Sequence, residues 1–204
     1  MTDSAQSQIK PVRGRRRKAD APEGGRKDAV LAAAAELFAE RGYAATSIRD
    51  IAERVGLLGG SLYHYIKSKD ALFVRVHDMA LAGAEARIRA AIEGVEAPRE
   101  RLALACRTLL AIQLDPHSLT MPLMNDFRAV PEGVRGQLIA RRDDFETLFA
   151  ELVAAVDLPE GLDPDIYRIL LLTTLNSAAN WYRQGRLSLD EVSDQILKVY
   201  AILT

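Results

Sequence analysis

Hydrogen-bond donors of several kinds are crowded into one short stretch of this sequence. Ser61, Tyr63 and His64 fall within four residues, and Lys67 and Lys69 follow directly. Hydroxyl, imidazole and ammonium groups at this density suit contacts with phosphate oxygens, and a hydroxyl can also donate to a base edge. The stretch therefore indicates nucleic-acid binding. A plain surface or packing role for Tyr63 and His64 is the alternative, and the surrounding elements have to decide between the two.

Two short helices joined by a tight turn would position these donors. The first is predicted to begin at Thr46 or Ser47, since either hydroxyl can act as an N-cap, and an acid stands three residues after Ser47. Gly56 is expected at the turn with a positive φ. The second helix is expected from about Gly59 or Gly60 to Ile66. Helix, glycine-bearing turn, helix is the pattern of a helix-turn-helix that reads DNA.

Within this motif, the second helix is expected to meet the major groove with its N-terminal part. Gly60 would let the backbone approach the DNA closely, and Tyr65 is assigned to packing. Ser68 is the predicted N-cap of the helix that follows. The residues expected at the DNA are Thr46, Ser47, Gly60, Ser61, Tyr63, His64, Lys67 and Lys69.

Positive charge is concentrated at the same end of the chain. The net charge is −1, but residues 1–27 carry eight Lys or Arg against three Asp or Glu, whereas residues 76–204 carry 13 against 19. Residues 1–25 are polar and broken by Pro and Gly, which predicts a disordered arm. Its Arg15, Arg16 and Arg17 are expected either to contact phosphates or the minor groove, or to serve only as a solubilising tail.

Several functional classes are disfavoured by what the sequence lacks. It has no apolar run long enough to cross a membrane and no apolar segment typical of a secretory signal, and its single cysteine, Cys106, cannot form an intramolecular disulfide. These features favour the cytoplasm. No phosphate-binding glycine loop or nucleophile motif is present, and the three histidines do not have the spacing of metal ligands. We therefore expect no enzyme, no catalytic residue, no cofactor and no metal.

The whole chain reads as all-α, with about nine helices. The first folded helix is predicted over Arg26–Arg41, with Gly42 ending it. Three regions follow from the patterns: a basic arm over residues 1–25, a helix-turn-helix domain over 26–70, and a larger helical domain over 71–204 for ligand binding and dimerisation.

The last two predicted helices suggest assembly into a dimer. Pro164 lies in the first turn of one, and Ser188 with Glu191 forms a capping box that begins the other. Each helix carries an apolar stripe at spacings of three and four. Both helices could instead be ordinary core helices, but the first has a second stripe of Leu171, Leu172 and Leu175, which favours a two-fold dimer. The predicted interface is Ile166, Leu170, Thr173, Ser177, Trp181, Leu189, Val192, Ile196, Val199 and Leu203.

Four blocks, in this order and at this spacing, resemble the tetracycline-repressor (TetR) family of bacterial transcriptional regulators. They are Leu37-Phe38-Ala39-Glu40-Arg41-Gly42, Thr46-Ser47-Ile48-Arg49-Asp50-Ile51-Ala52, Gly60-Ser61-Leu62-Tyr63-His64-Tyr65 and Lys67-Ser68-Lys69-Asp70. The resemblance is close over residues 26–75. It implies a three-helix DNA-binding domain, a larger helical domain that binds ligand and dimerises, and repression relieved by a small molecule. One departure is Leu58-Gly59, where the family often has a small hydroxyl residue and a lysine. The family's base contacts are therefore not carried over.

The segment from Asn180 to Ser188 resembles TetR-family members that sense acyl-CoA thioesters, although Gln184 stands where they usually have proline. The implied partners are an operator in double-stranded DNA, a second copy of the chain and a small hydrophobic effector, for which this resemblance implies an acyl-CoA. Met121, Met124 and Phe127 would line an adaptable cavity, or simply pack as core. Arg141 and Arg142 would meet the phosphates. Asn176, Asn180 and Trp181 complete the ligand candidates, although the asparagines could instead bond across the dimer. The alternatives are a regulator of efflux or stress genes that responds to an unrelated hydrophobic compound, and a dimeric DNA-binding protein without a ligand.

Overall fold

The computed structural model describes residues 23–115, 130–183 and 185–202. These residues form eight helices and no strand, which confirms the all-α prediction and is close to the expected nine helices. The helices are α1 (Glu23–Ala45), α2 (Ile48–Arg54), α3 (Gly59–Leu62), α4 (Lys69–Ala91), α5 (Pro98–Leu114), α7 (Glu132–Ala154), α8 (Pro164–Trp181) and α9 (Leu189–Val199).

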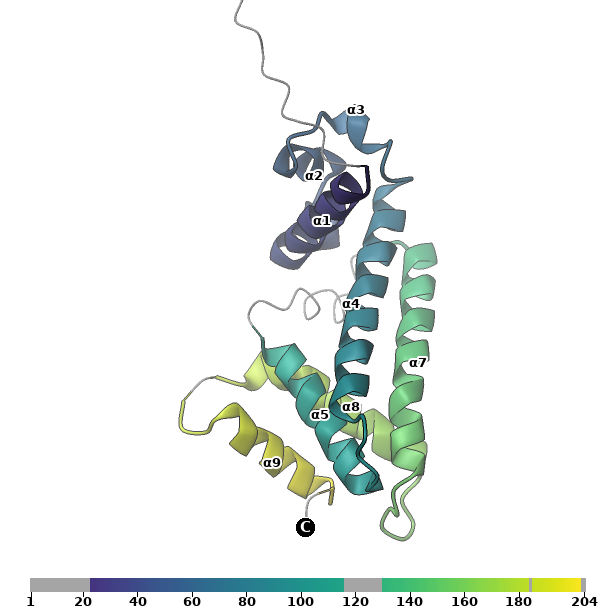
Figure 1. The fold of residues 1–204 in the computed structure, drawn as a ribbon, viewed down its shortest axis with the longest axis vertical. Helices are drawn as coiled ribbons and strands as arrows, with labels where there is room; N and C mark the ends of the chain where they lie inside the picture. The colour runs from purple at the N-terminus through teal and green to yellow at the C-terminus, as the bar shows by residue number, and fades with distance from the viewer. Residues whose placement is uncertain (1–22, 116–129, 184, 203–204) are drawn as a thin grey trace, which may run out of the picture.

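The molecule is elongated, with a small three-helix group at one end (Figure 1). Helices α1, α2 and α3 form this group, and α4 runs away from it toward the other end. Helix α7 lies alongside α4, while α5, α8 and α9 gather at the far end. The long α4 therefore connects the two ends physically.

Local sequence signals explain where the helices begin. The Ser188 hydroxyl accepts from the Glu191 amide, the Glu191 carboxylate accepts from the Ser188 amide, and α9 begins there as predicted. Pro98 and Pro164 stand in the first turns of α5 and α8, where a missing N–H costs nothing. Gly42 has a φ of 77° and kinks the chain, but it does not end the helix as predicted, because helical turns continue to Ala45. Helix α1 also starts at Glu23 rather than Arg26.

Two hydrophobic clusters form the core, and α4 contributes to both. Leu72, Phe73 and Val76 pack with α1, α2, α3 and the first part of α7. Further along α4, Leu81 and Ile88 belong to a larger cluster with α5, α7, α8 and α9. A displacement of α4 would therefore change the packing of both clusters, one at each end of the molecule.

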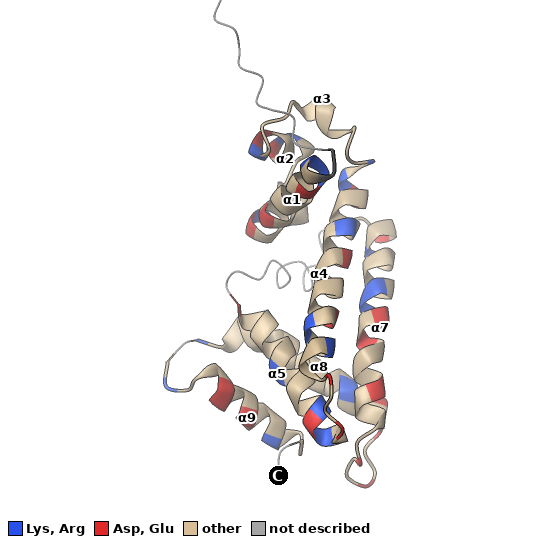
Figure 2. Cartoon of the chain, viewed as in Figure 1, with Lys and Arg blue, Asp and Glu red and all other residues tan. Residues whose placement is uncertain are grey.

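Charges are distributed unevenly over the helices (Figure 2). Helices α4 and α7 carry both signs along their length, whereas α3 carries none. The expected recognition helix must therefore contact a nucleic acid through its backbone and its neutral side chains, with cations supplied by the flanking segments.

Candidate nucleic-acid interface

Helix α2 is held by the cap that its sequence predicts. The Ser47 hydroxyl accepts from the Asp50 amide, and the Asp50 carboxylate accepts from the Ser47 amide at 2.8 Å. The hydrogen bonds from the Ser47 hydroxyl and amide lower the pKa of Asp50. Ile51 and Ala52, on the inner face of α2, are fully buried. After the helix, Gly56 turns the chain with a φ of 69°. The start of α2 is thus fixed relative to α1 and α3.

Helix α3 is shorter than predicted, because it ends at Leu62 rather than Ile66. Leu58 is its N-cap and makes no side-chain capping bond, and two glycines in the first turn weaken it further. The chain beyond Leu62 continues in hydrogen-bonded turns, with the Tyr65 amide donating to the Leu62 carbonyl at 2.8 Å. Leu62 is fully buried and anchors the helix to the core, and Tyr65 packs on the same core as expected.

Helix α3 and the turn that follows it expose the donors that the sequence singled out. Tyr63 is 58% exposed, and His64 and Gly60 are also exposed, while Ser61 is half-buried. Beside them an open groove runs between the starts of α2 and α3. It is lined by Ser47, Ile48, Arg49, Glu53, Leu57, Leu58, Gly59 and Tyr63. The first turns of both helices and their neutral donors are thus accessible to a ligand on one face.

Sequence reasoning missed Arg49 on this face. Its side chain is exposed and lines the groove, on the side of α2 opposite the buried Ile51. The helical spacing of the apolar residues already implied that position 49 faces outward. We therefore add Arg49 to the candidate contacts.

Thr46 was expected at the DNA, and this is corrected by the structure. The side chain is buried, and its hydroxyl lies 2.8 Å from the Gly42 carbonyl oxygen and 3.1 Å from that of Leu37. The hydroxyl therefore ties the end of α1 to the start of α2. A buried hydroxyl that already donates to backbone carbonyls cannot also contact a nucleic acid, so Thr46 is removed from the candidate DNA contacts.

Lys69 occupies the first turn of α4, next to an aromatic cluster. Its Nζ lies 4.1 Å from the centroid of the Tyr43 ring, and the Tyr43 hydroxyl donates to the Asp70 carboxylate. Burial, together with Asp70, raises the pKa of Tyr43 to about 12, and burial lowers the pKa of Lys69. Lys67 is exposed, and Ser68 caps α4 as predicted by accepting from the Ala71 amide. Lys67 is thus the more accessible of the two predicted lysine contacts.

Some predicted contacts lie outside the described residues. These are Arg15, Arg16 and Arg17 of the arm, Met121, Met124 and Phe127 of the expected cavity, and Leu203 of the expected interface.

The other ligand candidates lie on two different helices. On α7, Arg141 pairs with Asp78 of α4 at 3.3 Å, and Arg142 lies 3.6 Å from Glu146. On α8, Asn176 accepts from the Gln113 amide at 2.7 Å. Further along α8, Asn180 is exposed, and the indole of Trp181 donates to Ser177. These contacts do not by themselves assemble one site.

Gln113 is a polar residue of the larger domain that sequence reasoning missed. It is 2% exposed at the end of α5, and its Oε1 is buried without a hydrogen-bond partner in the described part of the chain. A glutamine within an otherwise apolar helical stripe was the available signal.

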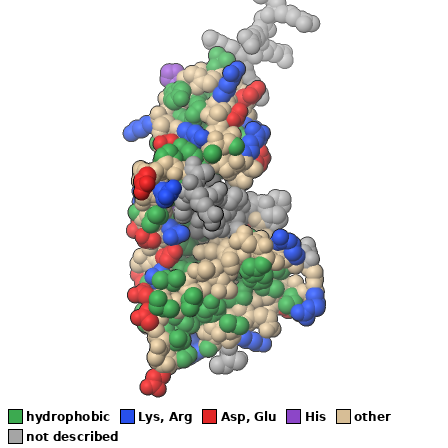
Figure 3. Space-filling view, turned by 180° about the vertical axis from the view of Figure 1, so that it is seen from behind, with side chains coloured by type: hydrophobic (Ala, Val, Ile, Leu, Met, Phe, Trp, Pro, Cys, Tyr) green, Lys and Arg blue, Asp and Glu red, His purple; other side chains and the backbone are tan. Residues whose placement is uncertain are grey.

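One face of α8 is apolar and exposed. Ile166, Leu170 and Trp181 are each about half exposed, with Ile169 beside them, whereas Leu171, Leu172 and Leu175 are buried in the core. The second stripe thus faces the domain, as expected. Figure 3 shows hydrophobic side chains gathered over the lower half of the molecule, where α8 lies.

Helix α9 departs from the prediction. Val192 and Ile196 are buried in the chain's own core, so they cannot form the predicted dimer seam. The reason is that α9 packs on α5, where Arg107 also pairs with Asp194 of α9 at 2.5 Å. Val199 remains 81% exposed, and Leu189 is half-buried.

No helix in the described part of the chain is long and apolar enough to cross a membrane. Within the same residues, no three His, Cys, Asp or Glu side chains are placed to hold a metal ion.

Comparison with known sequences finds matches over both parts of the chain. Residues 30–76 match the sequence model of "Bacterial regulatory proteins, tetR family", and residues 95–201 match "Tetracyclin repressor-like, C-terminal domain". The HTH-type transcriptional repressor KstR2 of Mycolicibacterium smegmatis is 30% identical over 182 residues, which cover 85% of this chain and 88% of that protein.

Solved structures show the same fold. The ketosteroid transcriptional regulator KstR2 of Mycobacterium tuberculosis has a TM-score of 0.68 and 26% identity, covering 86% of this chain and 92% of that one. AibR in complex with isovaleryl coenzyme A and operator DNA has a TM-score of 0.75 and 22% identity, covering 85% and 97%. The capped α2, the exposed α3 and these matches over most of the chain lead to one conclusion: the chain belongs to the TetR family of bacterial DNA-binding transcriptional regulators.

Proposed function

We propose that the chain is a cytoplasmic transcriptional repressor that binds a near-palindromic operator as a homodimer. An effector with an apolar acyl group, an acyl-CoA thioester, releases it. The observation that carries the proposal is the exposed face of α3 on a firmly capped α2, in a chain that matches a repressor over most of its length. Residues 26–70 would bind DNA, and residues 71–204 would bind the effector and dimerise.

At the DNA, each copy would place α3 in a major groove. Gly60 admits close approach of the backbone, and the Tyr63 and His64 side chains supply donors to phosphates. Arg49 and Lys67 add positive charge on either side. Ser47 and Ser61 complete the set, and Lys69 would contribute through the first turn of α4.

Dimerisation would use the exposed face of α8, because this face leaves large apolar side chains in water. A two-fold dimer would present two copies of α3 about 34–36 Å apart, one helical turn of DNA. The operator would then contain two related half-sites.

The effector class is supported by similarity rather than by a described cavity. The fold neighbour AibR binds isovaleryl coenzyme A and operator DNA, and residues 180–188 resemble acyl-CoA sensors. The buried amide of Gln113 and the half-buried amide of Asn176 would give such a ligand a polar partner at the end of α5. To switch an operator from almost fully bound to almost fully released, the effector must prefer the releasing state by about 5.5 kcal/mol.

The first test is a mobility-shift assay with the DNA upstream of the chain's own gene, with and without a series of acyl-CoA thioesters. We expect a shifted complex that one thioester abolishes while free coenzyme A does not. If no thioester affected the complex, the chain would still be a DNA-binding repressor, but the acyl-CoA effector would be rejected. The effector would then be an unrelated hydrophobic compound, or DNA binding would be independent of any ligand. If genome-fragment selection also failed to recover any bound DNA, the proposal would be rejected.

Substitutions then test the contacts. Tyr63→Phe and His64→Ala should weaken operators of different sequence alike, since both side chains are assigned to phosphates. Lys67→Ala should lower the slope of log affinity against log salt by about 1 for each recognition site. Lys198→Ala is the matched control, because Lys198 is an exposed lysine on α9, far from α3. A change in base preference alone would contradict the phosphate assignment.

A further inference from the structure

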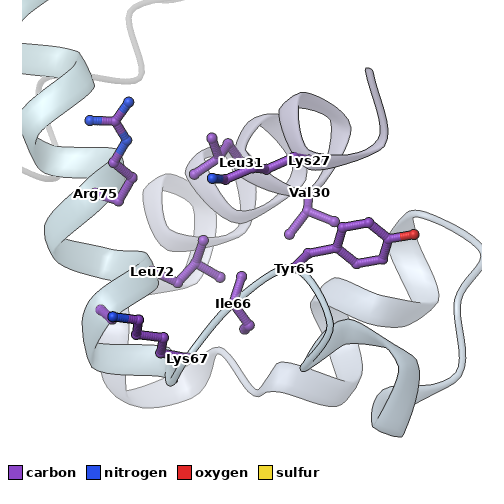
Figure 4. A pocket seen from close by; sticks show the side chains of 9 residues that line it. Lys27, Val30, Leu31, Tyr65, Ile66, Lys67, Leu72 and Arg75 are labelled. Atoms are coloured by element: carbon purple, nitrogen blue, oxygen red, sulfur yellow. The ribbon is translucent and has the colours of Figure 1, made fainter. Parts of the chain in front are cut away.

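A small hollow lies within the helix-turn-helix end of the molecule, on a different set of residues from the groove beside α3. It has a volume of about 130 Å³ and is bounded by α1, α4 and the turn between α3 and α4 (Figure 4). Its lining is Lys27, Val30, Leu31, Tyr65, Ile66, Lys67, Ala71, Leu72 and Arg75. Except for Lys67, no residue of this lining is assigned to the DNA contact proposed above.

The lining combines an apolar floor with cations and contains no acid. Figure 4 shows Leu72 and Ile66 between Lys67 and Lys27, while the Tyr65 hydroxyl points away from the hollow. Lys27 and Arg75 extend from α1 and α4 on either side. Each element that borders the hollow thus supplies one positive charge.

These three cations differ from the arginines that form ion pairs in the larger domain. Arg89, Arg107, Arg141 and Arg168 each pair with a carboxylate. In contrast, Lys27, Lys67 and Arg75 have no carboxylate partner within the described ranges, and all three are exposed. Three cations around an apolar floor, with no acid in the lining, favour an anion as the ligand.

The size and polarity of the hollow define the anion. An apolar cavity of about 150 Å³ is enough to hold benzene, so 130 Å³ admits a chain of about five or six carbons. A DNA phosphate has no apolar part to cover the floor formed by Val30, Leu31 and Leu72. We propose that this hollow is a binding site for a short-chain organic carboxylate, with its chain on the floor and its carboxylate among Lys27, Lys67 and Arg75.

Such a ligand would join three elements. Its carboxylate would bridge α1, α4 and the turn that follows α3, and this turn is the part of the motif with the least regular structure. Because the ligand binds the folded state, it should also raise the melting temperature of the protein.

The test uses the full chain without DNA, so it does not depend on the proposed function. Hexanoate is titrated by calorimetry into the millimolar range, because a ligand this small binds weakly. Acetate supplies the same charge without the chain, and hexylamine supplies the chain with the opposite charge. We expect hexanoate to bind at least about tenfold more tightly than either.

Two variants locate the site. Arg75→Ala removes one cation from an exposed position, and Ala71→Phe fills the hollow from its exposed rim without changing a charge. Each should weaken hexanoate about tenfold or more. Arg87→Ala, an exposed arginine further along α4, is the matched control and should bind hexanoate like the wild type.

The proposal is overturned if acetate binds as well as hexanoate, or if both variants bind hexanoate normally, which would place the ligand elsewhere, such as in the effector domain. It is also overturned if Arg75→Ala weakens only operator DNA, since the cation would then serve a phosphate. Folding of each variant is checked by its thermal unfolding curve. The exposed position of Arg75 keeps the test decisive even if Ala71→Phe misfolds.

Discussion

At the scale of single residues, two neighbouring side-chain hydroxyls have different structural roles because one is exposed and the other is buried. Ser47 is exposed and caps α2, whereas Thr46, its neighbour, is buried and bonded to carbonyls at the end of α1. Adjacent positions at a helix start point in different directions, and only the packing of α1 decides which hydroxyl turns inward. This difference could not be read from the sequence.

Substitutions at Thr46 test this inward role. Thr46→Val keeps the shape but removes the hydroxyl, leaving the buried Leu37 carbonyl and the Gly42 carbonyl without this partner. It should cost about 1–2 kcal/mol of unfolding free energy. Thr46→Ser keeps the hydroxyl and should cost less. Urea unfolding measures both. If folded Thr46→Val protein lost operator affinity while its stability stayed unchanged, Thr46 would be a DNA contact after all.

His77 is a second buried polar residue, on α4, with Asp78 and Arg142 as its charged neighbours. Burial lowers the pKa of His77 to about 4, because the charged form would lose its hydration. The unfolded chain, with an ordinary pKa of about 6.5, therefore takes up a proton at this residue first. The stability that the neutral side chain maintains is complete above about pH 6.5 and is lost as the pH falls toward 4.

This predicts a pH dependence that one substitution removes. Between pH 7 and pH 5 the wild type should lose about 2 kcal/mol more unfolding free energy than His77→Phe, which cannot titrate. Urea unfolding at the two pH values, at one protein concentration, gives both losses. The titration of carboxylates changes the unfolding free energy of both proteins equally. Equal losses in the wild type and in His77→Phe would therefore show that His77 is not held neutral.

At the scale of elements, helix starts could be predicted from sequence, whereas the partners of helices could not. The capping boxes at Ser47 and Ser188 are local, and both form as expected. Helix α9 does have the apolar face that its sequence predicts, but periodicity shows only that a helix buries one face. Whether that face meets the same chain or a second copy depends on α5, which is distant in sequence, and here Val192 and Ile196 turn toward it.

The same limit applies to α3 and to the ion pairs. Without a side-chain cap, and with two glycines, α3 ends before its apolar spacing would suggest, because spacing does not measure helix propensity. Long-range pairs leave no local signal. Arg168 of α8 meets Glu146 of α7 at 2.6 Å across 22 positions, and Arg142 lies on the other oxygen of the same carboxylate.

Glu146 should therefore connect α7 and α8 energetically. Both Glu146 and Arg168 are largely buried, and Glu146→Gln leaves the guanidinium with only the exposed Asp165 carboxylate at 3.5 Å. A double-mutant cycle with Arg168→Met should therefore give a coupling of about 1 kcal/mol or more. The exposed Glu85 and Arg89 pair on α4 is the control and should couple by less than about 0.5 kcal/mol. Equal couplings for the two pairs would mean that the α7 and α8 contact is held by apolar packing alone.

At the scale of the whole molecule, the shared helix α4 and the exposed face of α8 suggest how two copies act together. Helix α4 is embedded in both hydrophobic clusters, and the Asp78–Arg141 pair joins it to α7. Helix α7 in turn contacts α8. A change of packing at the proposed dimer face therefore has a continuous route of contacts to α3.

The proposed dimer face can be tested by one charge. Leu170→Glu places a carboxylate in the middle of the exposed apolar face of α8, where a second copy would have to bury it without a partner. We expect a monomer in sedimentation velocity, and a slope of log operator affinity against log salt that falls to about half, because only one recognition helix remains bound. Ile139→Glu, an exposed apolar residue of α7, is the matched control and should stay dimeric. If Leu170→Glu remained a dimer with normal operator affinity, the two copies would have to meet through another surface, and the spacing of about 34–36 Å between recognition helices would need a different geometric origin.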